Sequence, residues 1–378
     1  LATHGYSPRP KYIARPLGEG PSALESLVIN QDFWRGRSVF MTGHTGFKGG
    51  WLCLWLSQLG AKIHGYALEA PTTPSFFIET QLHRRLQSST IGDIRDLPNL
   101  ISAMRSSKPS IVFHMAAQPL VLESYKAPVE TFTTNVIGTV NLLESVRQSC
   151  SVEAVINVTS DKCYENQERA EPYRETDRLG GHDPYSSSKA CAELAAIAYR
   201  KSFLSKSEVH LASVRAGNVI GGGDWATDRL VPDFLRALDA GRTLRIRSPN
   251  AVRPWQHVLD PLSGYLLLAE RIVGEGSVFA DAWNFGPDDT DAKPVSSIAD
   301  HLVKKFPRAA WEREAVPQPH EACLLKLDSV KAREELGWAP RWPIDKALDE
   351  TIEWHKAWKK NHSMVDVSIK QIEEHQGS

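Results

Sequence analysis

The sequence has no long apolar run, few cysteines and no excess of either charge, and each absence narrows the choice of function. The most apolar stretch, WLCLWLSQLG at residues 51–60, spans about three helical turns, which is too short to cross a bilayer. The 44 basic and 45 acidic residues give a net charge of -1 and form no long block, so neither a membrane nor a nucleic acid is the expected partner. A small-molecule partner is favoured instead.

The cysteine pattern indicates a reducing compartment. An odd number of cysteines without a CxxC motif is typical of free thiols, so we expect a cytoplasmic protein without a metal site; the five are Cys53, Cys150, Cys163, Cys191 and Cys323. Residues 1–33 contain Pro, Gly and basic residues but no apolar segment of a signal peptide. We predict that they form a disordered N-terminal extension.

Short β-branched runs alternate with helix-length segments from residue 38 onward. The runs are SVFMTG, KIHGYAL, SSTIGD, SIVFHMAAQ, EAVINVTS and VHLASVRAGN. This alternation predicts an α/β fold with a Rossmann-type doubly wound parallel sheet, whose strands all end at one edge. After residue 220 shorter elements rich in Pro, Gly and Trp predict a smaller C-terminal α/β lobe. We therefore expect an NAD-binding domain at 34–220, a mainly substrate-binding lobe at 221–360 and a C-terminal tail at 361–378.

The stretch TGHTGFKGG, residues 42–50, joins the first predicted strand to a helix. Its glycines allow a tight turn, close approach of a diphosphate to the helix N-terminus, and packing of helix on strand. A tight turn without a ligand is the simpler alternative. We predict a dinucleotide site made of Gly43, Thr45, Gly46, Phe47, Lys48 and Gly49.

Two acidic residues bear on the adenosine half of that dinucleotide. The usual ribose partner is an acid at the end of the second strand, but the chain reads IHGYALEAPTT there and Glu69 comes about two positions late. No arginine occupies this stretch, which favours NAD over NADP. Asp93 follows the third strand, where it is either an adenine ligand or a helix N-cap.

The stretch DPYSSSKA places Tyr185 and Lys189 four residues apart, on one face of a helix. A lysine in that position can lower the pKa of the phenol so that tyrosinate acts as a base. Ser160, at a strand end 25 residues upstream, completes the set. Together these motifs resemble the extended short-chain dehydrogenase/reductase family over residues 38–354.

This resemblance implies roles for individual residues. Ser160, Tyr185 and Lys189 would be catalytic, with Tyr185 and Lys189 also at the cofactor. Ala116 and Ala117 of HMAAQ would line the nicotinamide side of NAD. Asn135 and Asn218 match positions that the family uses for structure or phosphate contacts, and we predict that they bind the substrate.

Asp161 and Lys162 follow Ser160 in VINVTSDKCYEN and are not needed for alcohol oxidation. A surface ion pair worth about 0 to 1 kcal/mol is the simpler interpretation. The alternative is an added elimination, because an acid and a base at this position mark the nucleotide-sugar 4,6-dehydratases within the family. Most of these carry Asp-Glu, whereas Asp-Lys, GHTGFKGGWL and RPWQHVLDP resemble the branch that acts on CDP-glucose.

The resemblance implies a reaction in three steps. Tyr185 takes the proton of the sugar 4-OH as C4 is oxidised, Lys162 removes the C5 proton, and Asp161 protonates the departing 6-OH. Neutral lysine beside a protonated aspartate is unfavourable in water by about 6.5 pKa units, or roughly 9 kcal/mol, and burial must reduce this gap. Otherwise Lys162 serves as both base and acid.

Arginines of the second lobe are the predicted anchors of the substrate. Arg253 could bind a diphosphate bidentately, with a core ion pair to Asp260 as the alternative, and Arg245 or Arg247 is a weaker candidate. The resemblance implies a homodimer or dimer of dimers and a role in 3,6-dideoxyhexose synthesis for the O-antigen of lipopolysaccharide. An epimerase of the same family and a non-catalytic NAD sensor are the competing functions.

Overall fold

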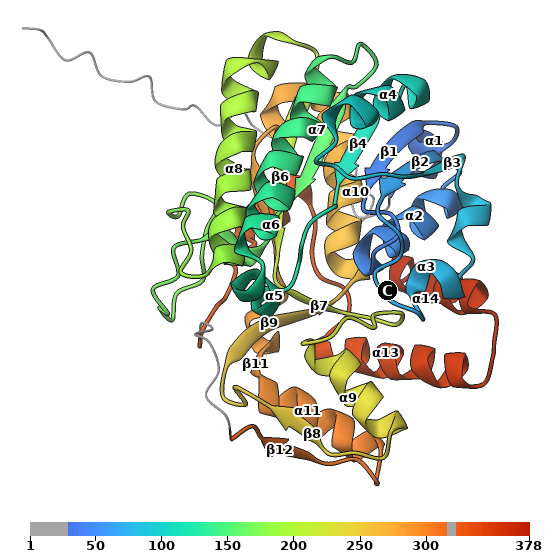
Figure 1. The fold of residues 1–378 in the computed structure, drawn as a ribbon, viewed down its shortest axis with the longest axis vertical. Helices are drawn as coiled ribbons and strands as arrows, with labels where there is room; N and C mark the ends of the chain where they lie inside the picture. The colour runs from blue at the N-terminus through green and yellow to red at the C-terminus, as the bar shows by residue number, and fades with distance from the viewer. Residues whose placement is uncertain (1–28, 316–322) are drawn as a thin grey trace, which may run out of the picture.

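A computed structural model describes residues 29–315 and 323–378. Its centre is a seven-stranded parallel sheet in the order β10-β6-β5-β4-β1-β2-β3 (Figure 1). The strands are β1 (Ser38–Thr42), β2 (Lys62–Ala67), β3 (Ser88–Ile91), β4 (Ile111–His114), β5 (Ala154–Val158), β6 (His210–Ala216) and β10 (Ala282–Phe285). The first six match the predicted runs, so the α/β sheet fold is confirmed.

Helices cover both faces of this sheet because its strands alternate apolar side chains between two cores. Val39 and Met41 of β1 face one core, which is completed by α2 (Phe47–Gln58), α10 (Leu259–Glu275), α12 (Val330–Leu336) and α14 (Met364–Gln376). Phe40 faces the other core, with α4 (Leu97–Ser107), α7 (Gly138–Arg147) and α8 (Pro184–Ser202). The absence of polar alternation in the strands follows from this double burial.

The second lobe lies at the lower end of the molecule in Figure 1. It contains a three-stranded sheet, β11-β9-β7, and a two-stranded sheet, β12-β8, packed with three helices. The elements are β7 (Asn218–Ile220), β8 (Leu244–Ile246), β9 (Val252–His257), β11 (Ala292–Pro294), β12 (Trp311–Arg313), α9 (Leu230–Asp239), α11 (Val295–Lys305) and α13 (Ile344–Lys359).

Short helical elements make up the connections. They are α1 (Gln31–Trp34), α3 (Phe76–Glu79), η2 (Leu82–Arg85), α5 (Val121–Lys126), α6 (Pro128–Phe132), the π-helical η3 (Thr133–Ile137), η4 (Asp161–Cys163), η5 (Leu204–Lys206), η6 (Gly276–Phe279) and η7 (Asp289–Asp291). None of the helices in the described ranges is both long and apolar enough to cross a membrane.

The predicted boundaries need three corrections. The expected tail at 361–378 is wrong, because α14 returns to the main sheet domain and His375 Nε2 lies 2.9 Å from Asp260 Oδ1 in the core. The extension predicted for 1–33 ends too late, since Ile29 is buried and α1 starts at Gln31; residues 1–28 lie outside the described part. Residues 221–360 are also not a separate lobe throughout, because β10 and α10 complete the main sheet domain.

Candidate active site

The glycine-rich turn between β1 and α2 is too closely packed for side chains at two of its glycines. Gly43 has φ +77°, and a Cβ there would lie 2.7 Å from the backbone nitrogen of Ala116. A Cβ on Gly49 would lie 2.2 Å from the carbonyl oxygen of Gly43. Gly46 caps α2 without a side chain over the first helical N–H groups. An open helix N-terminus bordered by bare backbone fits the diphosphate of NAD.

The other predicted members of the turn point in different directions. Thr45 Oγ1 donates to the carbonyl of Leu68, 2.9 Å away, which ties the turn to the end of β2. Lys48 Nζ donates to the hydroxyl of Tyr265 on α10 at 2.8 Å. Burial, with the charges of Lys189 and Arg229, lowers the pKa of Lys48 to about 7, although Asp161 opposes the shift. Lys48 is therefore within electrostatic reach of the catalytic candidates.

Asp93 is not the helix N-cap that the sequence left open. That cap is Asp96, whose carboxylate accepts from the backbone N–H of Asn99. Asp93 instead forms an ion pair with Arg95 at 2.5 Å, and hydrogen bonds from Arg95 lower the pKa of Asp93 despite partial burial. A contact from Asp93 to adenine stays a prediction.

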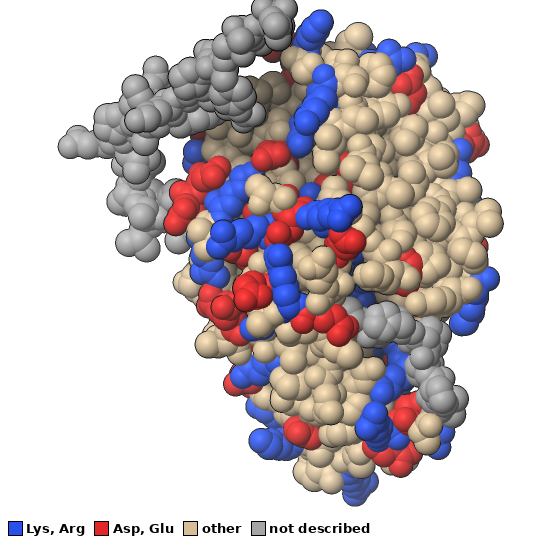
Figure 2. Space-filling model, turned by 90° about the vertical axis from the view of Figure 1, so that its left-hand side faces the viewer, with Lys and Arg blue, Asp and Glu red and all other residues tan. Residues whose placement is uncertain are grey.

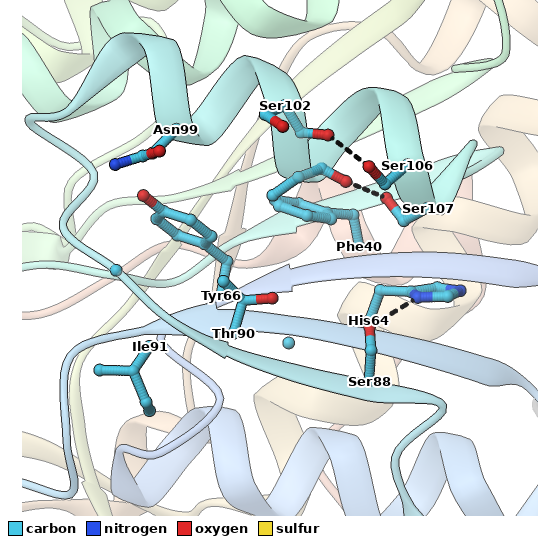
Figure 3. A pocket seen from close by; sticks show the side chains of 13 residues that line it. Phe40, His64, Tyr66, Ser88, Thr90, Ile91, Asn99, Ser102, Ser106 and Ser107 are labelled. Atoms are coloured by element: carbon cyan, nitrogen blue, oxygen red, sulfur yellow. Dashed lines mark hydrogen bonds between the residues drawn. The ribbon is translucent and has the colours of Figure 1, made fainter.

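A groove that Gly92 borders, next to Asp93, lies between β1, β2, β3 and α4 (Figure 3). Asn99, Ser102, Ser106 and Ser107 line it from α4, opposite Tyr66 and Thr90. None of the predicted site residues borders it. The groove therefore does not belong to the predicted active site.

The Ser-Asp-Lys stretch forms a one-turn 3-10 helix, η4, directly after β5. Ser160 caps η4 by accepting from the backbone N–H of Lys162 at 3.2 Å, and its hydroxyl donates to Asp161 Oδ1 at 3.0 Å. Asp161 is only 2% exposed, which excludes a surface ion pair for its carboxylate. Burial raises the pKa of Asp161, although Lys162, Ser160 and Arg253 oppose the shift. The Oδ2 atom of Asp161 has no hydrogen-bond partner among the described residues.

The catalytic tyrosine and lysine candidates lie on α8, next to this turn. Asp183 caps α8 by accepting from the backbone N–H of Ser186 at 2.9 Å, which fixes Tyr185 in the first helical turn. Lys189 Nζ reaches the carbonyl of Val158, at the end of β5, at 3.4 Å. Both side chains are buried, with 7% of Tyr185 and 6% of Lys189 exposed. The structure thus brings the two sequence motifs together.

Burial dominates the ionisation of this pair. It raises the pKa of Tyr185 to about 12; the hydrogen bond with Ser160 and the charge of Arg229 lower it, while Asp161 raises it. The predicted lowering of the phenol pKa is therefore wrong for the protein alone, since burial outweighs the cations. Burial lowers the pKa of Lys189 to about 8, and Cys163 and Glu193 oppose that shift.

The predicted substrate residues separate into different environments. Arg253 is 3% exposed and its charge acts on Asp161, whereas the carboxylate of Asp260 accepts from His375 and from the backbone N–H of Arg341. Arg245 lies exposed on β8, in an ion pair with Glu312 at 3.2 Å, so nothing in its surroundings supports substrate binding.

The two predicted asparagines also differ. Asn135 is buried and donates to Ser188 Oγ at 2.9 Å and to the carbonyl of Gln118, so its amide positions α8 and the HMAAQ segment rather than reaching outward. Asn218 begins β7, in register with Trp255 of β9. Its contact with substrate stays a prediction.

Sequence analysis missed three charged residues near the site, of which Arg229 is half-buried and Glu193 and Arg215 are buried. Arg229 pairs with Asp224 at 2.8 Å, and its charge acts on Tyr185 and Lys48. Glu193 and Arg215 form a buried ion pair behind η4. Glu193 follows Lys189 by the same four-residue step that separates Lys189 from Tyr185, so that spacing is a signal that could have identified it. In the described ranges, no group of three or more His, Cys, Asp or Glu could hold a metal ion.

Comparisons with known proteins identify the family of the chain. A family model described as GDP-mannose 4,6 dehydratase matches residues 40–351. A CDP-glucose 4,6-dehydratase of Salmonella typhimurium strain LT2 is 52% identical over 354 residues, which cover 92% of this chain and 98% of that protein.

Solved structures reproduce the fold. A dTDP-glucose 4,6-dehydratase from Bacillus anthracis in complex with NAD superposes with a TM-score of 0.70 at 21% identity, over 87% of this chain and 100% of that one. A UDP-glucose 4-epimerase from Thermotoga maritima with UDP-glucose gives a TM-score of 0.73 at 22% identity, over 85% and 99%. Because both reactions occur on this fold, the fold alone does not choose between them.

Proposed function

The chain belongs to the GDP-mannose 4,6 dehydratase family, and we propose that it is an NAD-dependent hydro-lyase that converts CDP-glucose to CDP-4-keto-6-deoxyglucose and water. One observation carries the proposal: Asp161 is buried beside Ser160, and its Oδ2 atom has no hydrogen-bond partner among the residues that the structure describes. An epimerase has no use for such an acid. The relative at 52% identity supports CDP-glucose as the substrate.

We expect residues of the glycine-rich turn and of the segment after β4 to bind the cofactor. The backbone of Gly43, Gly46 and Gly49 and the N-terminus of α2 would hold the diphosphate, and Ala116, in contact range of Gly43, would border the nicotinamide. NAD, when bound, accepts a hydride from C4 of the sugar and returns it to C6. Its positive ring also favours ionisation of nearby acids.

Oxidation at C4 requires a base at the 4-OH. Tyr185 takes that proton, and Ser160, whose hydroxyl lowers the pKa of the phenol, binds the same oxygen. Because the pKa of Tyr185 is about 12 in the protein alone, the charges of Arg229, Lys189 and bound NAD must together favour the phenolate.

Elimination follows because the new 4-ketone acidifies C5. Lys162 removes the C5 proton, and Asp161, whose raised pKa favours the protonated form, donates to the departing 6-OH. The proton on Lys162 returns to C5 as C6 is reduced. At the end of the cycle Tyr185 holds one proton more, and Asp161 one proton fewer, than at the start. Transfer of this proton from Tyr185 to Asp161 restores both residues.

Substitution of the acid and the base separately tests these roles. We expect Asp161→Asn to slow loss of water by about 10²- to 10⁴-fold while C4 is still oxidised, so that NADH accumulates. We expect Lys162→Met to abolish exchange of the C5 proton with deuterium oxide. If neither change affects either step, Asp161 and Lys162 are bystanders and epimerisation becomes the better function.

The second lobe would bind the nucleotide diphosphate. Arg253 and Arg229 are the proposed anchors because their charges act on Asp161 and Tyr185, at the reacting end of the substrate. Arg229 here replaces Arg245 as the second candidate. The use of the product for 3,6-dideoxyhexoses of the O-antigen, and a cytoplasmic location, are further parts of the proposal.

A homodimer is also proposed. Helices α6 and α7, which η3 joins end to end, both pack against α8 (Figure 1). Apolar residues are exposed on α6, η3 and α8, among them Val129 (75%), Ile137 (48%) and Leu194 (55%). Figure 2 looks at the side of the molecule on which α8 lies in Figure 1, and it shows charged residues gathered centrally and to the left, with few at the upper right. Exposed apolar surface of this kind is typical of an interface. We expect Val129→Asp with Leu194→Glu to give a monomer in light scattering; an unchanged mass would exclude this face.

A further inference from the structure

A buried ion pair lies behind the catalytic turn. Arg215 of β6 and Glu193 of α8 have side chains that are 2% and 0% exposed, and two bonds of 2.8 and 2.9 Å join them in a bidentate arrangement. Burial opposes ionisation of Glu193, yet the charge and hydrogen bonds of Arg215 and the hydroxyls of Thr159 and Ser213 lower its pKa. Such pairs are often no more stabilising than apolar residues of the same volume. The pair is therefore better explained by what it holds in place.

On one side the pair holds the residue just before the catalytic turn. Thr159 Oγ1 donates to Glu193 Oε1 at 2.5 Å, and Thr159 directly precedes Ser160. Glu193 lies on the same face of α8 as Tyr185 and Lys189, two turns beyond Tyr185 and one turn beyond Lys189. Together with the bond from Lys189 to the carbonyl of Val158, this contact fixes the end of β5 against the helix.

On the other side the pair holds the residue just after the turn. Arg215 Nη1 donates to the hydroxyl of Tyr164 at 2.8 Å, and the guanidinium carbon lies 4.9 Å from the centre of the Tyr164 ring. The same hydroxyl donates to Asn284 Oδ1 on β10 at 2.7 Å. Thr159 and Tyr164 thus enclose residues 160–163, and a single ion pair contacts both.

We propose that Glu193 and Arg215 are positioning residues for the elimination, which clamp both ends of the turn carrying Ser160, Asp161 and Lys162 against the helix carrying Tyr185 and Lys189. This inference rests on the proposed function. It extends that function to two residues that touch neither substrate nor cofactor.

The two halves of the reaction depend on this clamp unequally. Tyr185 and Lys189 belong to a helix of 19 residues, whose apolar side chains pack in the core independently of the ion pair. Asp161 and Lys162 belong to a 3-10 helix of only three residues, which is too short to fix the positions of its side chains by itself. Loosening the clamp should therefore misplace the acid and base of the elimination more than the base of the oxidation.

The test compares the two steps in single turnovers with CDP-glucose. Glu193→Gln keeps the shape but removes the charge, and Arg215→Lys keeps the charge but loses the bidentate bond and the reach to Tyr164. A displacement of about 1 Å can cost about 10²-fold. We expect loss of water to fall by about 10²-fold while formation of NADH falls by less than about fivefold, so that NADH accumulates transiently.

Two smaller changes and one control complete the design. Thr159→Val and Tyr164→Phe each remove a single hydroxyl of the clamp and should give the same imbalance in weaker form. Glu144→Gln removes the charge from an exposed ion pair with Arg147 on α7 and should leave both steps unchanged. Circular dichroism establishes folding of every variant.

The outcomes separate this inference from the proposed function. If both steps slow by the same factor in Glu193→Gln and no NADH accumulates, the pair is merely structural and the inference is overturned. If Glu193→Gln does not fold, Thr159→Val and Tyr164→Phe provide the test. If the ratio of the rates of NADH formation and water loss is then the same as in the wild type, the inference is also overturned. Wild-type protein that binds NAD but removes no water from CDP-glucose refutes the proposed function itself.

Discussion

Replacement of Gly49 by alanine tests the geometry of the cofactor turn. The added Cβ would stand 2.2 Å from the Gly43 carbonyl oxygen, whereas ordinary contact begins at 3.4 Å, so the turn would have to open by about 1.2 Å. The three nearest atoms, the carbonyl oxygen and carbon of Gly43 and the Cα of His44, all belong to the backbone and cannot rotate away. Overpacking of this kind costs about 1 to 3 kcal/mol.

The cost should appear mainly as lost affinity for NAD. A turn that relaxes in the free protein must be closed again to receive the diphosphate, so the same 1 to 3 kcal/mol weakens binding by about 5- to 150-fold. Titration calorimetry with NAD measures the affinity directly. Thermal unfolding with and without NAD measures the cost to the fold.

Gly274→Ala is the matched control. Gly274 lies in α10, and a Cβ there has no neighbour within 4 Å. Alanine at this helical position should stabilise the protein by about 0.5 to 1 kcal/mol and leave the affinity for NAD unchanged. If Gly49→Ala binds NAD like the wild type, the turn does not hold the diphosphate and the assignment of the cofactor site is wrong.

Two pH effects follow from the buried charges. Lys48 has a pKa of about 7, and an anionic diphosphate bound nearby would raise that pKa. Binding of NAD should therefore take up a proton above pH 7, and the affinity should fall as the pH rises. Calorimetry in two buffers of different ionisation enthalpy should show this proton uptake, and Lys48→Met should abolish it. Burial raises the pKa of Glu270 to about 7, although bonds from Trp34 and Asn30 oppose the shift. Because the folded state holds this proton more tightly than the unfolded state, the stabilisation is complete below pH 4.5 and is lost as the pH rises through 7. We therefore expect the free energy of unfolding of Glu270→Gln, measured in urea, to rise relative to that of the wild type by up to about 3 kcal/mol between pH 5 and pH 8. If variant and wild type differ by the same free energy at both pH values, the raised pKa of Glu270 is contradicted.

Sequence periodicity was sufficient for the main sheet but not for its last strand. Six strands are short apolar runs rich in β-branched residues, and these local signals match β1 to β6. β10 is only four residues long, Ala282–Phe285, and lies among Pro, Gly and Asp. It pairs with β6 over 60 residues away along the chain, so only the tertiary fold reveals it.

The site shows the same division between local and tertiary information. Tyr185 and Lys189 are one helical turn apart, and Ser160, Asp161 and Lys162 are adjacent, so each group could be predicted from spacing. The partnership of Glu193 with Arg215 joins α8 to β6 and has no sequence pattern of its own. Burial is likewise invisible in sequence, which is why the direction of the pKa shift of Tyr185 was mispredicted.

Removal of water from CDP-glucose is the reaction that we assign to this protein. The most direct measurement incubates the protein with NAD and, separately, CDP-glucose, CDP-galactose, dTDP-glucose and GDP-mannose, and follows the mass of each product. We expect the mass of one water molecule to be lost from CDP-glucose without net formation of NADH. An unchanged mass with inversion at C4 would contradict the account, because it would make the protein an epimerase and leave Asp161 and Lys162 without a catalytic role.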